Sequence, residues 1–416
     1  MYRGPRGTAD LLPSEQKFWR YLESNAENVA ERFGYRRIDT PVFEDSGLFV
    51  RGVGQGTDLV EKETYTFQDR GGDMLTLRAE GTAPVCRAYL EHGMHNLVQP
   101  VRLYYFTSIY RYERPQAGRY REHHQFGIEA IGDGNPAVDA EVIELGWRFL
   151  SGIGLQKFTI QVNSIGDFNC RPTYLGELKD YYAKRRGLLC DDCKVRFERN
   201  PLRLLDCKKE NCLALSAEAP HSIDHLCGEC QEHWDRLKGY LSALGLLFNI
   251  DHHLVRGLNY YTRTVFEIQP PVEGSQSAII GGGRYDGLIQ ELGGRPTPGI
   301  GFGMGIERVI LNLREQGISV PDQDGPKVMV SYIGDAACKE AIKLASQLRQ
   351  EGISATLAPS GKSIKGQMRH AFSLGTAYAI IIGDNELQKG TLILRDMGKG
   401  EQQEATLAQV KQILQG

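Results

Sequence analysis

The stretch from Phe106 to Gly132 constrains the fold most, because its pattern predicts two strands joined by a long basic loop. Residues two apart in a strand point to the same side, so Gln125, Gly127 and Glu129 share one face of the second strand. Gly127 leaves room on that face for another group to approach the backbone. The alternate residues are apolar and are expected to face the core: Phe126, Ile128 and Ala130.

The first strand of this hairpin is expected to end on Arg111 and Glu113, which then share a face. The loop that follows is basic and contains turn residues: Arg114, Pro115, Gly118, Arg119 and Arg121. A sheet face that holds a cation, two acids and an amide is costly to bury without a ligand. The alternative is a surface hairpin with exposed salt bridges, which is an ordinary arrangement.

The N-terminal segment predicts a helix from Ser14 to Phe33, then a strand from Tyr35 to Phe43 that is interrupted at Pro41. Because proline cannot donate to a strand ladder, Pro41 favours a sheet edge or a subunit boundary. Plain core packing of this helix and strand is the alternative. Further along, Glu80 and Thr82 precede a helical pattern. A carboxylate there either complements the positive end of the helix or accepts hydrogen bonds from a substrate ammonium group.

The stretch Leu254–Ile268, LVRGLNYYTRTVFEI, places Arg256 before a glycine at the expected start of a strand, where its side chain can project into a cleft. Tyr260 and Tyr261 are expected to point to opposite faces of that strand, so that one floors a pocket and the other offers its hydroxyl group. Core packing is the alternative for this tyrosine pair.

Two glycine-rich stretches follow. Gly281–Leu288, GGGRYDGL, permits a close approach to the backbone. In the second, glycine occupies alternate positions of an expected strand: Gly299, Gly301, Gly303 and Gly305. One face of that strand then has no side chains, so a flat adenine ring can stack on it and Arg308, at the start of the next helix, can reach a phosphate. The sequence has no G-x-x-x-x-G-K-[ST] phosphate loop.

Six of the nine cysteines lie between Cys190 and Cys230. Two C-x-x-C pairs, Cys190 with Cys193 and Cys227 with Cys230, have the spacing of zinc ligands, and the chain between them must fold back to join them. The intervening cysteines are Cys207 and Cys212. Reduced thiols without a metal are the alternative, because nothing in the sequence indicates export to an oxidising compartment.

The 416 residues, 41% of them hydrophobic, allow two or three domains. Residues 168–249 have more charge and mostly helical spacing, which predicts a helical insertion in a catalytic core that spans 1–325. Residues 326–416 alternate strands and helices, which predicts a small α/β domain. The net charge of −3 leaves nucleic-acid contact to local basic patches, such as the helix near Lys365. No apolar run could span a membrane and no signal peptide is indicated, so a cytoplasmic location is expected.

The Arg-x-Glu strand end, the basic loop and the returning Gln-x-Gly-x-Glu strand resemble motif 2 of the class II aminoacyl-tRNA synthetases. The N-terminal helix and strand resemble motif 1, and the glycine strand with Arg308 resembles motif 3. Leu254–Ile268 and Gly281–Leu288 are similar to two signature motifs of the histidyl-tRNA synthetase family, and the resemblance covers essentially the whole chain. It implies an α+β fold, with an antiparallel class II sheet flanked by helices, a helical insertion and a C-terminal α/β anticodon-binding domain.

The resemblance also implies a ligase that activates L-histidine with ATP and Mg²⁺ and transfers it to the 3′ end of tRNA(His). Arg111 and Arg256 would be catalytic, on opposite sides of the α-phosphate. The implied histidine-binding residues are Glu80, Thr82, Gln125, Glu129, Tyr260 and Tyr261. The implied ATP-binding residues are Arg111, Glu113, Arg119, Arg256 and Arg308. The implied contacts to the acceptor end of the tRNA are Gln116, Arg119 and Arg121.

Motif 1 builds a dimer interface in class II enzymes, so a homodimer is expected. The main rival function is the synthetase-like regulatory subunit of histidine biosynthesis, which is not catalytic. That paralogue lacks the anticodon domain and typically loses the Arg-Gly-Leu-x-Tyr-Tyr stretch, whereas this chain has both. A histidine-sensing or RNA-binding module would show degraded phosphate arginines, which are intact here.

Overall fold

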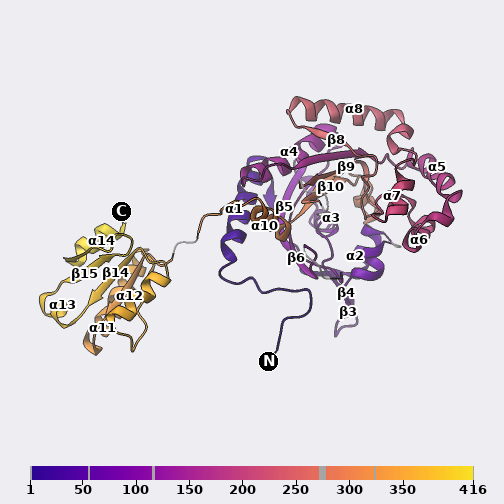
Figure 1. The fold of residues 1–416 in the computed structure, drawn as a ribbon. Coiled ribbons are helices and arrows are strands. Elements are labelled where there is room, and N and C mark those ends of the chain that lie inside the picture. The colour runs from indigo at the N-terminus through magenta and orange to yellow at the C-terminus, as the bar shows by residue number, and fades with distance from the viewer. Residues whose placement is uncertain (1, 55–56, 115–117, 271–277, 323–324, 416) are drawn as a thin grey trace. The chain divides into compact units, whose positions relative to one another are not determined.

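The structure, a computed structural model, describes residues 2–54, 57–114, 118–270, 278–322 and 325–415. The chain divides into two compact units, Met1–Val320 and Pro321–Gly416. In Figure 1 the first unit runs from indigo to orange and the second from orange to yellow. Each unit is built on its own sheet.

An eight-stranded sheet forms the centre of the first unit. Its strands, in spatial order, are β1 (Arg36–Arg37), β5 (Val101–Tyr110), β6 (Glu122–Ile131), β11 (Gly299–Gly305), β10 (Ile280–Arg284), β9 (Thr262–Gln269), β7 (Thr159–Ser164) and β8 (Phe248–Ile250). Neighbouring strands are antiparallel except at the two edges, where β1 runs parallel to β5 and β8 runs parallel to β7.

Helices cover one face of this sheet and bury its largest apolar cluster (Figure 1). They are α1 (Gln16–Arg32), α4 (Pro136–Gly152), α8 (Gly228–Ala243) and α10 (Ile306–Glu315). Phe126, Ile128 and Ala130 of β6 lie in this cluster, which confirms the predicted core face of that strand. The α4 helix begins where it does because the Asn135 side chain accepts a hydrogen bond from the Ala137 N–H, with Pro136 in the first turn.

The predicted hairpin is the pair β5–β6, in which Tyr105 lies opposite Gly127 and Leu103 lies opposite Glu129. The first strand ends at Tyr110, so Arg111 and Glu113 belong to the loop and not to the strand end as expected. The loop is closed at its base by the hydrogen bond from the Arg111 N–H to the Arg121 carbonyl oxygen, at 2.9 Å.

The second face of the sheet is covered by α3 (Thr82–Glu91) and by a cluster rich in tyrosine. Short elements surround this face: α2 (Ser46–Val53), α9 (Leu288–Glu291), a π-helical turn η1 (Leu59–Glu63) and a 3₁₀ turn η2 (Met94–Asn96). A separate three-stranded sheet has the order β2 (Phe43–Asp45), β4 (Met74–Leu77), β3 (Thr66–Gln68).

The segment 168–249, expected to be an insertion, is almost entirely helical. It contains α5 (Arg171–Ala183), η3 (Arg186–Leu188), α6 (Asp191–Arg199), η4 (Pro201–Leu204), α7 (Glu210–Ser216), η5 (Ser222–His225) and α8. Its last part does not stand apart from the core, because Trp234, Leu237 and Leu241 of α8 pack in the same apolar cluster as α4. The strand β8 likewise completes the edge of the main sheet.

The second unit has a five-stranded sheet with the order β13 (Ala355–Leu357), β12 (Val328–Tyr332), β14 (Tyr378–Ile382), β15 (Leu392–Asp396), β16 (Gln402–Ala405). The first three strands are parallel and the last two pairings are antiparallel. Its helices are α11 (Asp335–Gln350), α12 (Ile364–Ser373), α13 (Asp384–Lys389) and α14 (Leu407–Gln415). Among the described residues of both units, no helix combines the length and apolarity that a bilayer crossing requires.

Candidate active site

The centre of the second face of the main sheet is the carboxylate of Glu129, which is fully buried. Three hydroxyl groups donate hydrogen bonds to it: Thr82 at 2.8 Å and Tyr105 at 3.2 Å to Oε1, and Tyr285 at 2.6 Å to Oε2. Burial is the largest influence on this acid and raises its pKa to about 8, although the hydroxyl donors act in the opposite direction. Glu129 is therefore held in place before any ligand arrives.

Glu80 lies beside this group at the start of α3. Its carboxylate accepts hydrogen bonds from the backbone N–H groups of Thr82 at 2.8 Å and Ala83 at 2.6 Å, and from the Tyr260 hydroxyl at 3.3 Å. The helix-capping interpretation is thus correct for Glu80, and it does not exclude a ligand because each carboxylate oxygen has two lone pairs. Burial raises the pKa of Glu80, and the nearby Arg111 charge lowers it.

Tyr260 and Tyr261 do not point to opposite faces of a strand, as the sequence predicted. The strand β9 begins only at Thr262, and the two tyrosine rings lie together with their centroids 4.7 Å apart. Both side chains are buried. The pair therefore lies in the same buried group of side chains as Glu80 and Glu129, and the Tyr260 hydroxyl donates to Glu80.

Arg256 lies in the loop before β9, and its side chain contacts the same group of buried residues. Its Nη1 donates to Glu267 Oε1 at 2.7 Å, and its guanidinium carbon lies 5.6 Å from the centroid of the Tyr261 ring. Its Nε is buried and has no hydrogen-bond partner in the described parts of the chain. The guanidinium rests on Gly281, where a Cβ atom would lie 2.4 Å from Nη1, so a larger residue there would displace the Arg256 side chain.

Arg111 enters from the opposite direction, off the end of β5. Its Nε donates to the Ala79 carbonyl oxygen at 2.8 Å, which anchors the side chain next to Glu80. Glu113 stands between two cations at ion-pair distances that are long, 4.0 Å from Arg111 and 3.7 Å from Arg119. Arg308 belongs to the same group, because the charges of Arg119 and Arg111 both lower its pKa, after burial.

The strand β11 has only glycines on the face that points to the site, but side chains from neighbouring strands already cover part of this face. A Cβ atom on Gly301 would lie 2.0 Å from Glu129 Oε2, and one on Gly299 would lie 2.3 Å from the Tyr285 ring. Space increases along the strand, since the nearest atoms are at 3.3 Å, from Gln125, at Gly303 and at 3.7 Å, from Arg308, at Gly305. Room for a flat ring therefore lies at the Gln125 end.

The two arginines expected to be catalytic border the same group of side chains. Burial raises the pKa of both Glu80 and Tyr261; the Arg111 charge opposes this rise at Glu80, and the Arg256 charge opposes it at Tyr261. The charges of Glu129 and Glu80 add to the rise at Tyr261. The arrangement thus places two acids and two phenols between separate cations. Such a site can hold a substrate with both an anionic and a hydrogen-bond-donating end.

Comparison with known proteins agrees with this geometry. Residues 7–170 and 197–309 match the family described as histidyl-tRNA synthetase, and residues 327–416 match an anticodon binding domain. The chain is 55% identical over 410 residues to the histidine–tRNA ligase of Dehalococcoides mccartyi, covering 99% of this chain and 98% of that protein. The chain belongs to the histidyl-tRNA synthetase family.

Solved structures of the family show the same fold. The apo histidyl-tRNA synthetase of S. aureus is 36% identical, with a TM-score of 0.85 and complete coverage of both chains. A Bacillus halodurans protein titled as an ATP phosphoribosyltransferase regulatory subunit/histidyl-tRNA synthetase has a TM-score of 0.65 at 23% identity, covering 92% of this chain and 98% of that chain, a likeness of fold alone. The predicted family and α+β class are thus confirmed.

The three expected tRNA contacts of this family member differ in what the structure describes of them. Arg121 is engaged within the protein: its Nε donates to the Glu113 carbonyl oxygen at 3.3 Å, and its guanidinium carbon lies 4.0 Å from the centroid of the Tyr112 ring. Gln116 lies outside the described residues. Arg119 remains at the open edge of the site, with 45% of its side chain exposed.

Sequence reasoning on the family motifs missed Tyr105 and Tyr285, the two phenols that hold Glu129. Gly127 was expected to leave room for another group on its face, and the group that takes this space is the Tyr105 ring, since a Cβ atom on Gly127 would lie 2.2 Å from it. Finding Tyr105 required the register that sets it opposite Gly127. Tyr285 lies in the GGGRYD motif itself, and a tyrosine next to three glycines was the sequence feature that could have indicated a buried hydroxyl donor.

The motif arginine Arg284 has a structural role that was also missed. It is fully buried and ion-paired to the fully buried Asp139 of α4, at 2.5 Å. Asp139 also accepts from Thr264 at 2.6 Å, and Arg284 also pairs with Asp286 at 3.0 Å. Removing one partner of such a pair leaves an uncompensated buried charge, so this network fixes the end of β10 on α4.

The four cysteines expected to form one zinc site in this family member do not come together. Cys190 and Cys193 lie with Cys207 and Cys212, whereas Cys227 and Cys230 lie with Asp167 and Cys170. The two C-x-x-C pairs are divided because Cys227 and Cys230 begin α8, which belongs to the core of the main sheet. The predicted set of ligands is therefore wrong as a single site.

Proposed function

We propose that this chain is a histidine–tRNA ligase, which activates L-histidine with ATP and then transfers the histidyl group to the 3′ end of tRNA(His). The observation that supports this best is the buried Glu129, held by three hydroxyl groups within a site that Arg111 and Arg256 enter from separate elements. A carboxylate of this kind can fix one tautomer of an imidazole, and cations on either side suit a phosphoryl centre.

The amino-acid half of the site holds histidine as follows. Glu129 and Tyr261 face the two ring nitrogens, which distinguishes imidazole from the side chains of asparagine and glutamine because a wrong side chain leaves buried polar groups unpaired. Glu80, with Thr82 beside it, accepts hydrogen bonds from the α-ammonium group. Gln125 and Tyr260 complete the walls.

The nucleotide half positions ATP for attack on its α-phosphorus. A carboxylate oxygen of histidine forms the new P–O bond, the bond to the β-phosphate oxygen breaks, and pyrophosphate leaves. Arg111 and Arg256 stabilise the negative charge on the equatorial oxygens, and Arg308 and Arg119 hold the outer phosphates. The attacking carboxylate is already ionised, so no general base is needed for this step.

Mg²⁺ fits the same half of the site. The Glu113 carboxylate lies among arginines at 3.7 and 4.0 Å, longer than close ion pairs, so it can reach a hydrated cation on the phosphates. When bound there, the metal spreads the negative charge of the phosphates. The chain's own contribution is to hold the nucleotide between Arg111, Arg256 and Arg308.

Transfer requires contact with tRNA(His) at two places. Arg119, Arg121 and Gln116 of the motif 2 loop meet the acceptor end; Arg121 must first leave the Tyr112 ring to do so. The second unit, from residue 326 onward, reads the anticodon. The exposed Lys365 and Arg369 of α12, with Lys362 just before this helix, contact phosphate groups. Residues 1–325, with the insertion within 168–249, then form the catalytic part.

A homodimer is part of the proposal. Large apolar side chains are exposed around β2 and before β5, and they support a partner surface there: Val42, Phe43, Leu97 and Val98. Val98, for example, is 92% exposed. Sedimentation of the purified chain would test this, and a monomer at micromolar concentration would reject it.

Exchange of radioactive pyrophosphate into ATP tests the activity. It should depend strictly on histidine, and its absence from a folded protein would favour the regulatory-subunit function instead. A truncation that ends before Pro326 should retain exchange and lose tRNA charging. Equal loss of both activities would contradict the division of labour between the two units.

A further inference from the structure

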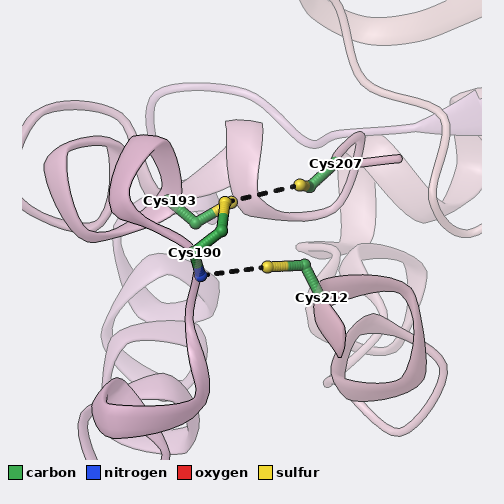
Figure 2. A group of neighbouring side chains, drawn as sticks. All are labelled: Cys190, Cys193, Cys207 and Cys212. Carbon is green, nitrogen blue, oxygen red and sulfur yellow. Dashed lines mark hydrogen bonds between the residues drawn. The ribbon is translucent and has the colours of Figure 1, made fainter. Parts of the chain in front are cut away.

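Four cysteines of the inserted segment converge on one point (Figure 2). Cys190 and Cys193 lie at the N-terminal end of α6, Cys207 follows η4, and Cys212 lies in α7. Their sulfur atoms all lie within 4.8 Å of one another. Cys193, Cys207 and Cys212 are buried and Cys190 is partly exposed, so the group is closed to substrates.

The spacing of the sulfur atoms matches a tetrahedral metal site and not a disulfide. The Cys190 and Cys207 Sγ atoms are 3.9 Å apart. A tetrahedron with Zn–S bonds of about 2.3 Å has edges of about 3.8 Å, whereas a disulfide bond is about 2.05 Å long. The Cys190 N–H also donates to Cys212 Sγ at 3.4 Å, an interaction that stabilises negative charge on the sulfur.

The cysteines are among the few side chains that α6 and α7 bury fully. The single buried residue of α6 is Cys193, and α7 buries only Cys212 and Ser216. A helix is normally fixed in place by an apolar stripe, and burial of one or two thiols supplies far less free energy. Each helix adds one partly buried apolar side chain, Phe197 on α6 and Leu215 on α7, so the cysteines make up much of what the two helices bury, as in small domains that a structural metal holds together.

We propose that Cys190, Cys193, Cys207 and Cys212 bind one structural Zn²⁺ as thiolates. Four thiolates in a closed tetrahedral arrangement favour zinc among the common metals. The positive N-terminal end of α6, on which Cys190 is the N-cap, helps to compensate the excess negative charge.

The second group, Asp167, Cys170, Cys227 and Cys230, is equally compact but differs in its charge partners. Arg263 Nη2 lies 3.4 Å from Asp167 Oδ2, and the backbone N–H groups of Asn169 and Cys170 donate to Oδ1 at 2.9 and 3.2 Å. The carboxylate is thus compensated without a metal ion. This group provides the matched control for the first.

The metal site has a consequence for catalysis that depends on the proposed function. The chain between Cys193 and Cys207 contacts the loop that holds Arg256: Asn200 Nδ2 donates to Asn259 Oδ1 at 2.8 Å. A Cβ atom on Gly257 would lie 2.9 Å from Arg203 Nη1. Zinc would therefore order the segment that packs against the Arg256 loop, which makes the four cysteines positioning residues.

Metal analysis of the full-length protein, expressed with added zinc and purified under reducing conditions, tests the site. We expect about one zinc ion per chain that is lost in the variant Cys193→Ser/Cys207→Ser. The control Cys227→Ser/Cys230→Ser should retain this metal. A chain that neither contains zinc as purified nor takes it up when reduced, or a zinc content unchanged by the Cys193→Ser/Cys207→Ser change, overturns the proposal, as does iron in place of zinc.

A second measurement covers the case in which the double variant does not fold. Cobalt titrated into the zinc-free, reduced wild-type protein should give the thiolate-to-metal absorption of a four-sulfur tetrahedral site, and Cys190→Ser, at the partly exposed ligand, should weaken this absorption. A spectrum of octahedral cobalt, or one that Cys190→Ser leaves unchanged, overturns the assignment. Because neither readout involves catalysis, the metal site and the proposed ligase activity can fail independently.

Discussion

The two halves of the active site differ in how their polar groups are satisfied. In the amino-acid half, Glu129 accepts from three hydroxyl groups and Glu80 accepts from two backbone N–H groups and a phenol, all within 3.3 Å. In the nucleotide half, Glu113 is 4.0 Å from Arg111 and 3.7 Å from Arg119, and Arg308 donates to the backbone carbonyl oxygens of Gly118 and Ala278.

This difference indicates separate tasks. The acids are fixed before substrate binds, so little entropy is lost when an imidazole of the right shape enters. Apart from Arg256, which pairs with Glu267 at 2.7 Å, the arginines make no close ion pair within the described residues, which leaves the charge of Arg111, Arg119 and Arg308 available for phosphate oxygens. Under the proposed function, the amino-acid half thus serves discrimination between side chains, and the nucleotide half stabilises charge that develops in the transition state.

The largest effect is expected from Arg256→Ala, in the nucleotide half. Loss of one charge-stabilising donor typically costs about 10²–10³-fold in rate, and we expect histidine-dependent exchange to fall by about 10³-fold, mainly in kcat. Arg148→Ala is the matched control, because Arg148 is an exposed cation paired with Glu144 on α4. If the exchange rate of Arg256→Ala fell by less than tenfold, Arg256 would not be a group that stabilises the transition state.

Glu129→Gln should affect the amino-acid half of the site, and it should change KM for histidine more than kcat. The amide oxygen still accepts hydrogen bonds on one side, but an NH2 group, which can only donate, replaces the other acceptor oxygen, and the charge that fixes the imidazole is lost. We therefore expect kcat/KM for histidine to fall by about 10²-fold, through KM. The KM for ATP should change little. Glu144→Gln, at a surface ion pair, is the control. Equal changes in both KM values would contradict the separation of the two halves.

Alternation along β6 was enough to predict which of its side chains face the site, and the glycine spacing of β11 predicted its bare face. Tyr105 could not be predicted in the same way, because local periodicity does not determine which residue of β5 lies opposite Gly127. The cysteines show the same limit. Sequence spacing predicted that the two C-x-x-C pairs join in one site, but α8 packs on α4, so Cys227 and Cys230 lie apart from Cys190 and Cys193.

Gly127→Ala tests whether the amino-acid half depends on its tight packing. The added methyl group would lie 2.2 Å from the Tyr105 ring, so the ring or the strand must move. We expect a loss of about 1–3 kcal/mol in the free energy of unfolding, with a raised KM for histidine as Tyr105 leaves Glu129. Chemical denaturation measures the first effect.

Gly176→Ala is the control for that substitution, because nothing lies within 4 Å of the position of its Cβ atom on α5. It should stabilise the protein by about 0.5–1 kcal/mol, since alanine is the better helix former. A Gly127→Ala protein as stable as the wild type would show that the packing around Glu129 is looser than the distances indicate.

The smallest effect is a pH dependence of stability that comes from Glu129. Its pKa is about 8 in the folded protein, against about 4.3 in an unfolded chain. Between these values the folded state keeps a proton that the unfolded state has released, so this group makes the free energy of unfolding decrease as pH rises, until the pH passes about 8.

Glu129→Gln removes that proton, and its stability relative to the wild type should therefore increase with pH. From pH 6 to pH 7 the gain is at most about 1.4 kcal/mol, the limit for one proton over one pH unit. Urea denaturation of both proteins at the two pH values measures it. If the difference in the free energy of unfolding between the two proteins were the same at both pH values, Glu129 would be charged in the free enzyme. The amino-acid half would then resemble the nucleotide half, in which the charges are present before substrate binds.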